Sequence, residues 1–308
     1  THAQDLGRER RCRMKPAFFI ILLLLLMVPG CGETPSEFRP LPAALGDLRG
    51  VAMGFERLQP LDQGIYSAWL RLEKGDRVGI GTFNVNSNGQ PVDAQGSVID
   101  RFTASESLFS AISILIAIEP TGDIGDAPSE FVILQGPFID GIATLVVPFP
   151  AGIQEASGSY RVFTPTDGPN TNEGSGVWAI DANGQPTMTL ADINNIYMYE
   201  HFVVINGMPV TMGRFRTTNT KDLRNPWSGP LNSEAPAVPG EDFLANAPAG
   251  LTFPADLSGS QLLVTLEALY DDRVEPSQLV VLEGTLPTVV GGEIIQLANQ
   301  TANFPTGT

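Results

Sequence analysis

Cysteine, lysine and histidine are scarce in this sequence, and each scarcity excludes a class of protein. The 308 residues include two cysteines, Cys12 and Cys31, and two histidines. A disulfide framework needs several cysteines, and a transition-metal centre needs several cysteine or histidine ligands. Lysine occurs three times, and Lys74 and Lys221 fall in turn or loop segments, which disfavours a serine–lysine catalytic pair. We therefore expect no cofactor, no transition metal and no enzymatic activity.

A long hydrophobic run is also missing near the N-terminus. The apolar segment from Ala17 to Val28 has twelve residues, whereas a membrane-spanning helix needs about 20. Five basic side chains precede it: Arg8, Arg10, Arg11, Arg13 and Lys15. A basic start, a short apolar middle and small residues at the end are typical of a secretory signal.

The segment Val28-Pro29-Gly30-Cys31 closes this signal and resembles the cleavage site of a bacterial lipoprotein. The resemblance implies removal of residues 1–30, lipid on Cys31 and attachment to a bacterial membrane on its extracytoplasmic side. Gly32 after the cysteine favours the outer membrane or periplasmic face in a Gram-negative cell. The alternative is an ordinary cleaved signal followed by a chance cysteine.

Basic residues are far fewer than acidic ones. The chain has 18 basic and 34 acidic residues and a formal charge of −16. Removing residues 1–30, which hold five basic and two acidic side chains, leaves −19. A surface with this much negative charge repels nucleic acid and favours solubility. Nucleic acid is thus not expected as a partner.

Sustained helical periodicity is absent after Cys31. Short apolar runs recur instead, separated by glycine, proline, asparagine and aspartate, with 32 glycines and 25 prolines in the chain. This pattern is typical of an all-β sandwich or barrel. The fold class expected is all-β, with two tandem immunoglobulin-like β-sandwich domains after the signal peptide.

The chain also repeats itself. The first copy has Tyr-x-x-Trp-Leu, a turn and Gly-x-Phe, and the second has Tyr-x-x-Phe-Val, the turn Asn206-Gly207 and Gly-x-Phe. Asn-Gly between apolar runs is a strong hairpin signal. Further on, the Glu-to-Pro and Glu-to-Gly spacings are the same after Glu119 and Glu267. Matching residue types at matching offsets predict a duplicated unit.

These repeats set the expected boundaries. Residues 31–47 are a lipid-attached tether and 48–150 the first β-sandwich domain, followed by a linker with a probable strand at 151–175. The second domain spans 176–308 and carries a long loop insertion at about 217–250. Long loops of this kind are often functional.

The repeated motif resembles the extracytoplasmic C-terminal domain of the anti-sigma-K factor family. The residues that carry the resemblance in the first copy are Tyr66, Trp69, Leu70, Gly81, Phe83, Glu119, Pro120, Gly122, Pro128, Leu134 and Gly136. The second copy keeps Tyr199, Gly213, Phe215, Glu267, Pro276, Leu282 and Gly284, with Phe202 in place of the tryptophan. The resemblance implies the outer fold of such membrane regulators. It does not imply sigma-factor binding, because a signal and a cysteine stand where the sigma-binding segment would be.

Few side chains suggest chemistry. His201 lies opposite Phe202 in an alternating strand, so we expect it to face outward, without a catalytic partner. Weak calcium candidates are Asp123, Asp126, Asp271 and Asp272, in equivalent loops of the two copies, although solvated turns explain them as well. Trp227 lies in the insertion and is either a contact for a protein or glycan, or a side chain that pins the loop.

The function expected is a lipid-anchored binding or sensing module of the bacterial envelope. Its partners would be the membrane, through lipid on Cys31, and an envelope protein or glycan. The alternative is a purely structural envelope lipoprotein, and an enzyme acting on envelope polymers is the third possibility.

Overall fold

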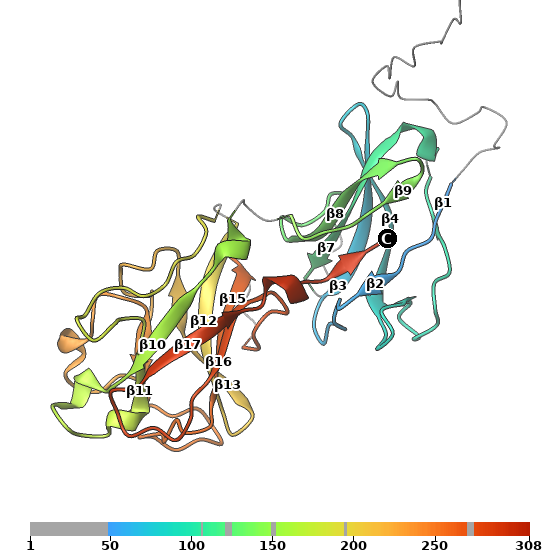
Figure 1. The fold of residues 1–308 in the computed structure, drawn as a ribbon. Coiled ribbons are helices and arrows are strands. Elements are labelled where there is room, and N and C mark those ends of the chain that lie inside the picture. The colour runs from blue at the N-terminus through green and yellow to red at the C-terminus, as the bar shows by residue number, and fades with distance from the viewer. Residues whose placement is uncertain (1–48, 106, 121–124, 149–151, 194–195, 270–273) are drawn as a thin grey trace, which may run out of the picture. The chain divides into compact units, whose positions relative to one another are not determined.

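The computed structural model describes residues 49–105, 107–120, 125–148, 152–193, 196–269 and 274–308 (Figure 1). These residues form β-strands and short 3-10 helices, and no α-helix occurs among them. The prediction of an all-β chain is therefore confirmed. Within the same ranges, no helix has the length and apolar character needed to cross a bilayer.

Two large antiparallel sheets dominate the described residues. The six-stranded sheet has the order β5 (Pro91–Val92), β4 (Arg77–Val85), β3 (Ile65–Leu72), β7 (Ala111–Glu119), β8 (Val132–Ile139) and β9 (Ile142–Ala143). The eight-stranded sheet has the order β13 (Met208–Phe215), β12 (Tyr197–Ile205), β15 (Gln261–Ala268), β16 (Val280–Thr285), β17 (Ile294–Asn299), β10 (Gly158–Val162), β11 (Gly176–Trp178) and β14 (Gly240–Asp242).

Smaller elements complete the fold. Two-stranded pairs join β1 (Gly50–Val51) to β6 (Phe102–Thr103) and β18 (Thr306–Gly307) to β2 (Phe55–Glu56). The 3-10 helices are η1 (Leu108–Ser110), η2 (Ile153–Glu155), η3 (Pro165–Asp167), η4 (Glu173–Ser175), η5 (Asn232–Glu234) and η6 (Thr301–Asn303).

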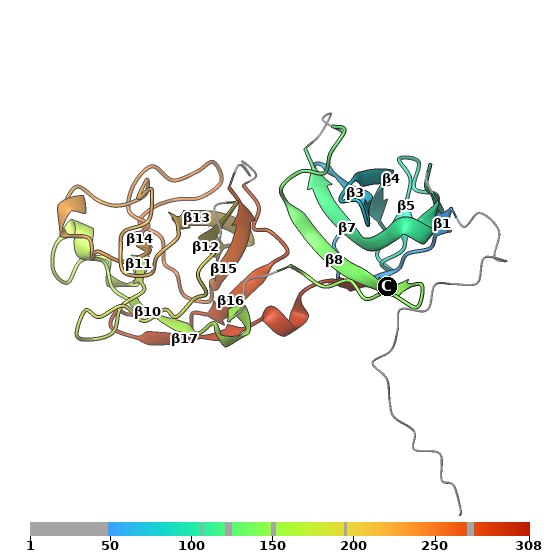
Figure 2. The ribbon, with the colours of Figure 1, turned by 90° about the horizontal axis from the view of Figure 1, so that it is seen from above.

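Four neighbouring strands in each sheet follow one plan. The order β4-β3-β7-β8 in the first sheet corresponds to β13-β12-β15-β16 in the second, and Figure 2 shows β3, β7 and β8 side by side. A register shift follows Ala68 in β3 and His201 in β12, opposite glycines with positive φ, Gly81 (151°) and Gly213 (124°). Both glycines belong to the Gly-x-Phe motif of the sequence repeat. They are needed there because a β-bulge with positive φ strains any other residue.

The two glutamates of the repeat make the same hydrogen bonds. Ser129 N–H donates to Glu119 Oε1 over 3.1 Å, and its hydroxyl donates over 2.7 Å to the carbonyl of the residue before that glutamate. In the second unit Ser277 N–H donates to Glu267 Oε1 over 2.8 Å, and its hydroxyl makes the equivalent 2.7 Å bond. Glu119 and Glu267 are buried, 3% and 1% exposed. Each buried carboxylate thus accepts a hydrogen bond from the loop that follows its strand, and a further one from a hydroxyl, that of Ser67 for Glu119 and that of Thr265 for Glu267.

The hairpin predicted at Asn206-Gly207 joins β12 to β13. Its central residues have φ values of 53° and 81°, the left-handed conformation that a type I′ turn requires. In both units a tyrosine of the first strand stacks on a phenylalanine of the second. The ring centroids of Tyr66 and Phe83 are 5.5 Å apart, and those of Tyr199 and Phe215 are 5.8 Å apart.

Two segments pair in ways that their sequence positions do not suggest. The strand expected within residues 151–175 is β10, which lies inside the eight-stranded sheet between β17 and β11. At the C-terminus, β18 pairs with β2, and Gly307 forms a bridge with Leu145. The last residues of the chain therefore pair with strands that come early in the sequence.

The insertion at 217–250 covers the free edge of β13. Leu223 N–H donates to Arg214 O over 2.9 Å, and the Trp227 indole N–H donates to Thr211 O over 2.8 Å. The insertion also contains η5 and the edge strand β14. Covering an edge in this way removes unpaired backbone groups that would otherwise invite another chain.

Candidate functional site: a buried histidine and acid cluster

His201 is at the centre of a buried polar cluster. Its Nδ1 lies 2.9 Å from the Tyr160 hydroxyl of β10, and its Nε2 lies 3.0 Å from Oδ2 of Asp222 in the insertion. The side chains of His201 and Asp222 have no exposed surface, and Tyr160 is fully buried. In the tautomer that carries its proton on Nε2, the ring donates to the Asp222 carboxylate and accepts the tyrosine proton at Nδ1.

The expectation that His201 faces outward is wrong. His201 does point away from Phe202, as strand alternation requires, but both faces of β12 are covered, and each of the two residues is at most 1% exposed. The sequence repeat held a signal for this. His201 occupies the place that Ala68, also fully buried, occupies in β3. A histidine at a core position of a repeat must find partners inside the protein.

Asp222 is held against the bulge in β13. A Cβ atom on Gly213 would lie 2.8 Å from Asp222 Cγ, so only glycine leaves room for the carboxyl group. Gly240 N–H also donates to Asp222 Oδ2 over 3.2 Å, while Oδ1 has no hydrogen-bond partner among the described residues. Through Oδ2 the acid thus connects β12 with the start of β14.

Two further acids follow directly in β14. Glu241 has no exposed surface and accepts hydrogen bonds from the Ser228 hydroxyl, from Asp242 N–H over 2.9 Å and from Trp227 N–H over 3.3 Å. Burial, with a smaller contribution from the nearby charge of Asp222, raises the pKa of Glu241 to about 8 against the lowering effect of those hydrogen bonds. Glu241 is therefore largely protonated at neutral pH.

Asp242 lies on the opposite side of β14 from Glu241 and has its own hydrogen-bond partners. Its Oδ1 accepts the Trp178 indole N–H over 2.7 Å, and its Oδ2 accepts the backbone N–H (2.9 Å) and hydroxyl (2.6 Å) of Thr166. Burial raises the pKa of Asp242 to about 6, and these donors limit the rise. Gly176 on β11 makes the approach possible, since a Cβ there would meet Oδ1 at 2.1 Å.

The hydrogen bonds of the cluster link the insertion to β11 and β12. None of its side chains is placed as a nucleophile. Both ring nitrogens of His201 are occupied, and Ser228 bonds to Glu241 rather than to the histidine. Burial and the charge of Asp222 raise the pKa of Tyr160 above its ordinary value, which keeps its hydroxyl a proton donor. The arrangement resembles a latch, here defined as Tyr160, His201, Asp222, Glu241 and Asp242, that holds the insertion on the sheet.

Trp227 packs within the protein. Its ring is half-buried against the hydrophobic core and meets Phe253 edge to face, with the centroids 6.0 Å apart. With its indole N–H on Thr211 and its backbone on Glu241, the side chain makes the contacts expected of a residue that pins the insertion.

The remaining residues singled out from the sequence are not brought together. Asp126 is exposed in the loop after β7. Cys31, Asp123, Asp271 and Asp272 lie outside the described residues. Within the described ranges, no group of three or more histidine, cysteine, aspartate or glutamate side chains could hold a metal ion.

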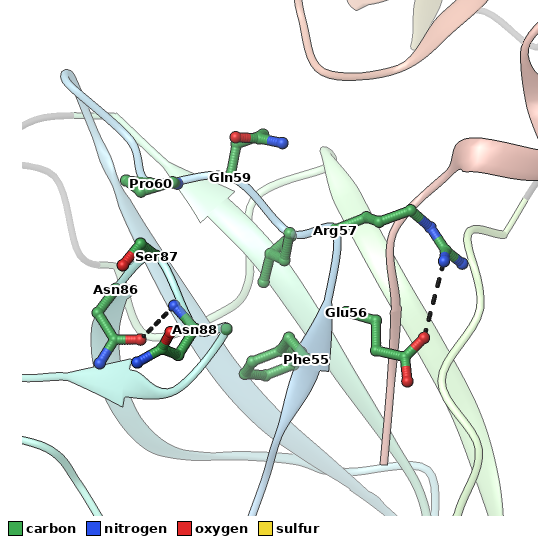
Figure 3. A pocket seen from close by; sticks show the side chains of 10 residues that line it. Phe55, Glu56, Arg57, Gln59, Pro60, Asn86, Ser87 and Asn88 are labelled. Atoms are coloured by element: carbon green, nitrogen blue, oxygen red, sulfur yellow. Dashed lines mark hydrogen bonds and ion pairs between the residues drawn. The ribbon is translucent and has the colours of Figure 1, made fainter.

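A pocket of about 410 Å³ lies beside β2, between residues 55–60 and the turn at 86–89 (Figure 3). Its polar groups are used locally: Asn86 Oδ1 accepts Asn88 N–H over 2.9 Å, and Glu56 lies 3.7 Å from Arg57. No feature of the sequence repeat marked this pocket. It offers a polar hollow without a buried ionisable group.

Comparison of the chain with protein-family models, with curated proteins and with solved structures finds no match. The fold and the latch are therefore interpreted on their own geometry.

Proposed function

We propose that this protein is a lipid-anchored binding module that works on the extracytoplasmic side of a bacterial membrane. The single observation that carries the proposal is the sequence Val28-Pro29-Gly30-Cys31 after a basic cluster and the apolar run Ala17 to Val28. Acyl chains on Cys31 would anchor the protein durably, because each buried CH₂ group contributes about 0.8 kcal/mol. A binding role fits an all-β scaffold in which both ring nitrogens of His201 are occupied by structural partners.

The anchor is tested by replacing Cys31 with serine and separating membranes from soluble fractions. We expect Cys31→Ser to move the protein into the soluble fraction and to abolish incorporation of labelled palmitate. Cys12→Ser is the matched control, since Cys12 precedes the apolar run, and it should change neither readout. Unchanged incorporation of labelled palmitate into Cys31→Ser would refute the anchor.

We also propose that the two four-stranded units are copies of one ancestral domain, related in fold to the outer domain of anti-sigma-K factors. Equal strand orders support the duplication, as do the bulges opposite Gly81 and Gly213 and the equal glutamate–serine bonds. Sigma-factor binding is not part of the proposal, because fold alone does not carry function.

A structural role in the envelope is the alternative to binding. Crosslinking of intact envelopes followed by purification of the protein separates the two. A reproducible stoichiometric partner, protein or glycan, supports the binding module, whereas recovery of bulk lipoproteins alone supports the structural role.

A further inference from the structure

Three turns meet at one end of the six-stranded sheet. Cross-strand pairing places Arg71 opposite Ser113, and Ser113 opposite Pro137, so the β3–β4 turn, the start of β7 and the end of β8 lie at the same end. The 3-10 helix η1 joins them, because Glu73 N–H donates to Ser110 O over 2.9 Å. We call this end, comprising residues 71–77, 108–112 and 137–142, the turn end.

Large apolar side chains are exposed at the turn end. Ile139 and Ile142 face each other across the β8–β9 hairpin and are 69% and 61% exposed. Phe109 in η1 is 45% exposed, and Ile112 is 37% exposed. Ile139 and Ile142 are paired on one hairpin, and Phe109 and Ile112 lie in η1 and at the start of β7, so exposed apolar side chains gather at this end of the sheet.

The charges at the turn end are balanced, unlike those of the chain. Arg71, Lys74 and Arg77 are exposed there, together with the acids Glu73, Asp76 and Asp140. The chain as a whole has a formal charge of −16. The turn end can therefore approach a negatively charged surface without the net repulsion that the rest of the protein would meet. Its basic side chains can reach phosphate groups from beside the apolar ones.

The chain enters the described region next to the turn end. Arg49 O accepts Ala104 N–H over 2.7 Å, and Arg49 Nη1 donates to Ser105 O over 2.9 Å. The residues after Ser105 lead directly into η1. The described part of the chain therefore begins beside the turn end, at Arg49.

We infer that the turn end is a membrane-contact surface, which lays Ile139, Ile142 and Phe109 into the headgroup boundary of an anionic bilayer. The inference rests on the proposed lipid anchor. About 18 residues separate Cys31 from Arg49, and a chain of that length spans at most about 60 Å when fully extended. Tethering over so short a distance raises the effective concentration of the surface at the bilayer, so weak contacts suffice.

The first test uses tryptophan fluorescence in the full-length lipidated protein, reconstituted into vesicles whose acyl chains carry bromine. Ile142→Trp places a reporter at the turn end, and Val290→Trp is the matched control, since Val290 is 78% exposed in the eight-stranded sheet region. The parent protein gives the background of Trp69, Trp178 and Trp227. We expect bromine to quench the reporter at position 142 and to leave the one at 290 unchanged. Equal quenching at both positions, or none at 142, would overturn the inference.

The second test does not depend on the anchor. The full chain carrying Cys31→Ser is mixed with vesicles of phosphatidylcholine, with and without about 30% phosphatidylglycerol, and binding is measured by flotation. We expect Ile139→Ser with Ile142→Ser to lower the partition coefficient about tenfold. Val274→Ser with Val290→Ser should leave it unchanged, since these valines are 71% and 78% exposed elsewhere.

Failure of the anchor and failure of the surface can be told apart. If Cys31→Ser still incorporates labelled palmitate while the isoleucine variant loses vesicle binding, the lipid anchor at Cys31 is refuted and the surface is supported. If both isoleucine and valine variants bind vesicles equally well, the surface is refuted whatever Cys31 does. Concentration-dependent dimerisation that the isoleucine variant abolishes, without vesicle binding by the parent, would assign the surface to a second copy and overturn the inference.

Discussion

Glu241 should make the protein lose stability as the pH rises, and Glu241→Gln should remove most of that loss. The folded-state pKa of about 8 lies above the ordinary value of 4.5 because burial disfavours the charged form. A group with a raised pKa contributes its full stability below the ordinary value and loses it as the pH rises toward the folded value. The window for Glu241 is therefore about pH 4.5 to 8.

The magnitude follows from the size of the shift. Each pKa unit corresponds to about 1.4 kcal/mol, so the shift of Glu241 amounts to roughly 5 kcal/mol of unfolding free energy lost across the window. That figure is an upper bound, because the segment can open locally before the carboxylate is fully penalised. Asp242, with a pKa of about 6, adds a smaller loss of the same sign at lower pH. Between pH 6 and 8 the slope should thus come mainly from Glu241.

Urea unfolding of the full chain at pH 5, 6, 7, 8 and 9 measures this slope. We expect Glu241→Gln to match the parent within about 1 kcal/mol at pH 5, with the small difference due to an amide group facing Trp227 N–H. At pH 8 and above the variant should be more stable by several kcal/mol. Glu234→Gln is the matched control, since Glu234 is exposed in the same insertion and should leave the curve unchanged. Parallel curves for parent and Glu241→Gln between pH 6 and 8 would refute the reasoning.

Three further changes test the packing by the same urea assay at pH 6. Gly213→Ala should cost about 3 kcal/mol or more, because the new Cβ meets Asp222 at a positive φ; Gly184→Ala, at a φ of 78° in open space, should cost about 1 kcal/mol, and equal losses would argue against the contact. Ser277→Ala and Ser129→Ala should each cost about 1–2 kcal/mol, since each removes the equivalent hydroxyl bond, buried at Ser277 and partly buried at Ser129, and a loss confined to one of them would contradict the equivalence of the two units. Trp227→Phe should cost about 1–3 kcal/mol by leaving the Thr211 carbonyl unpaired, and an unchanged free energy of unfolding would mean that water replaces the indole N–H.

The latch also explains how so long an insertion is held in place on the sheet. Each acid of the latch bonds to a residue distant in the sequence: Asp222 to His201, Glu241 to Ser228 and Asp242 to Thr166. Trp227, which lies between Asp222 and Glu241 in the sequence, packs on the core. Protonation of Glu241 removes the repulsion that its carboxylate would otherwise exert on the neighbouring Asp222. Burying three acids in this way is costly unless hydrogen bonds and protonation compensate, and both do so here.

The sequence by itself determined the features that depend on local periodicity and turn chemistry. Short apolar runs separated by glycine, proline, asparagine and aspartate predicted an all-β chain, because strands are short and such residues favour the turns between them. Asn206-Gly207 predicted its hairpin, because both residues tolerate a positive φ. The repeat offsets placed Gly81 and Gly213 at equivalent positions, which the strand registers share.

Only the tertiary structure decided which distant groups meet. Local sequence patterns do not show that Asp222, twenty-one residues from His201, hydrogen-bonds to the histidine ring. Nor do they show that β10 lies in the eight-stranded sheet or that β18 pairs with β2. His201 was misplaced because alternation fixes which face a side chain takes, whereas what covers that face depends on elements far away in the chain. Burial, and with it the raised pKa of Glu241, follows from that covering and not from the residue's neighbours in sequence.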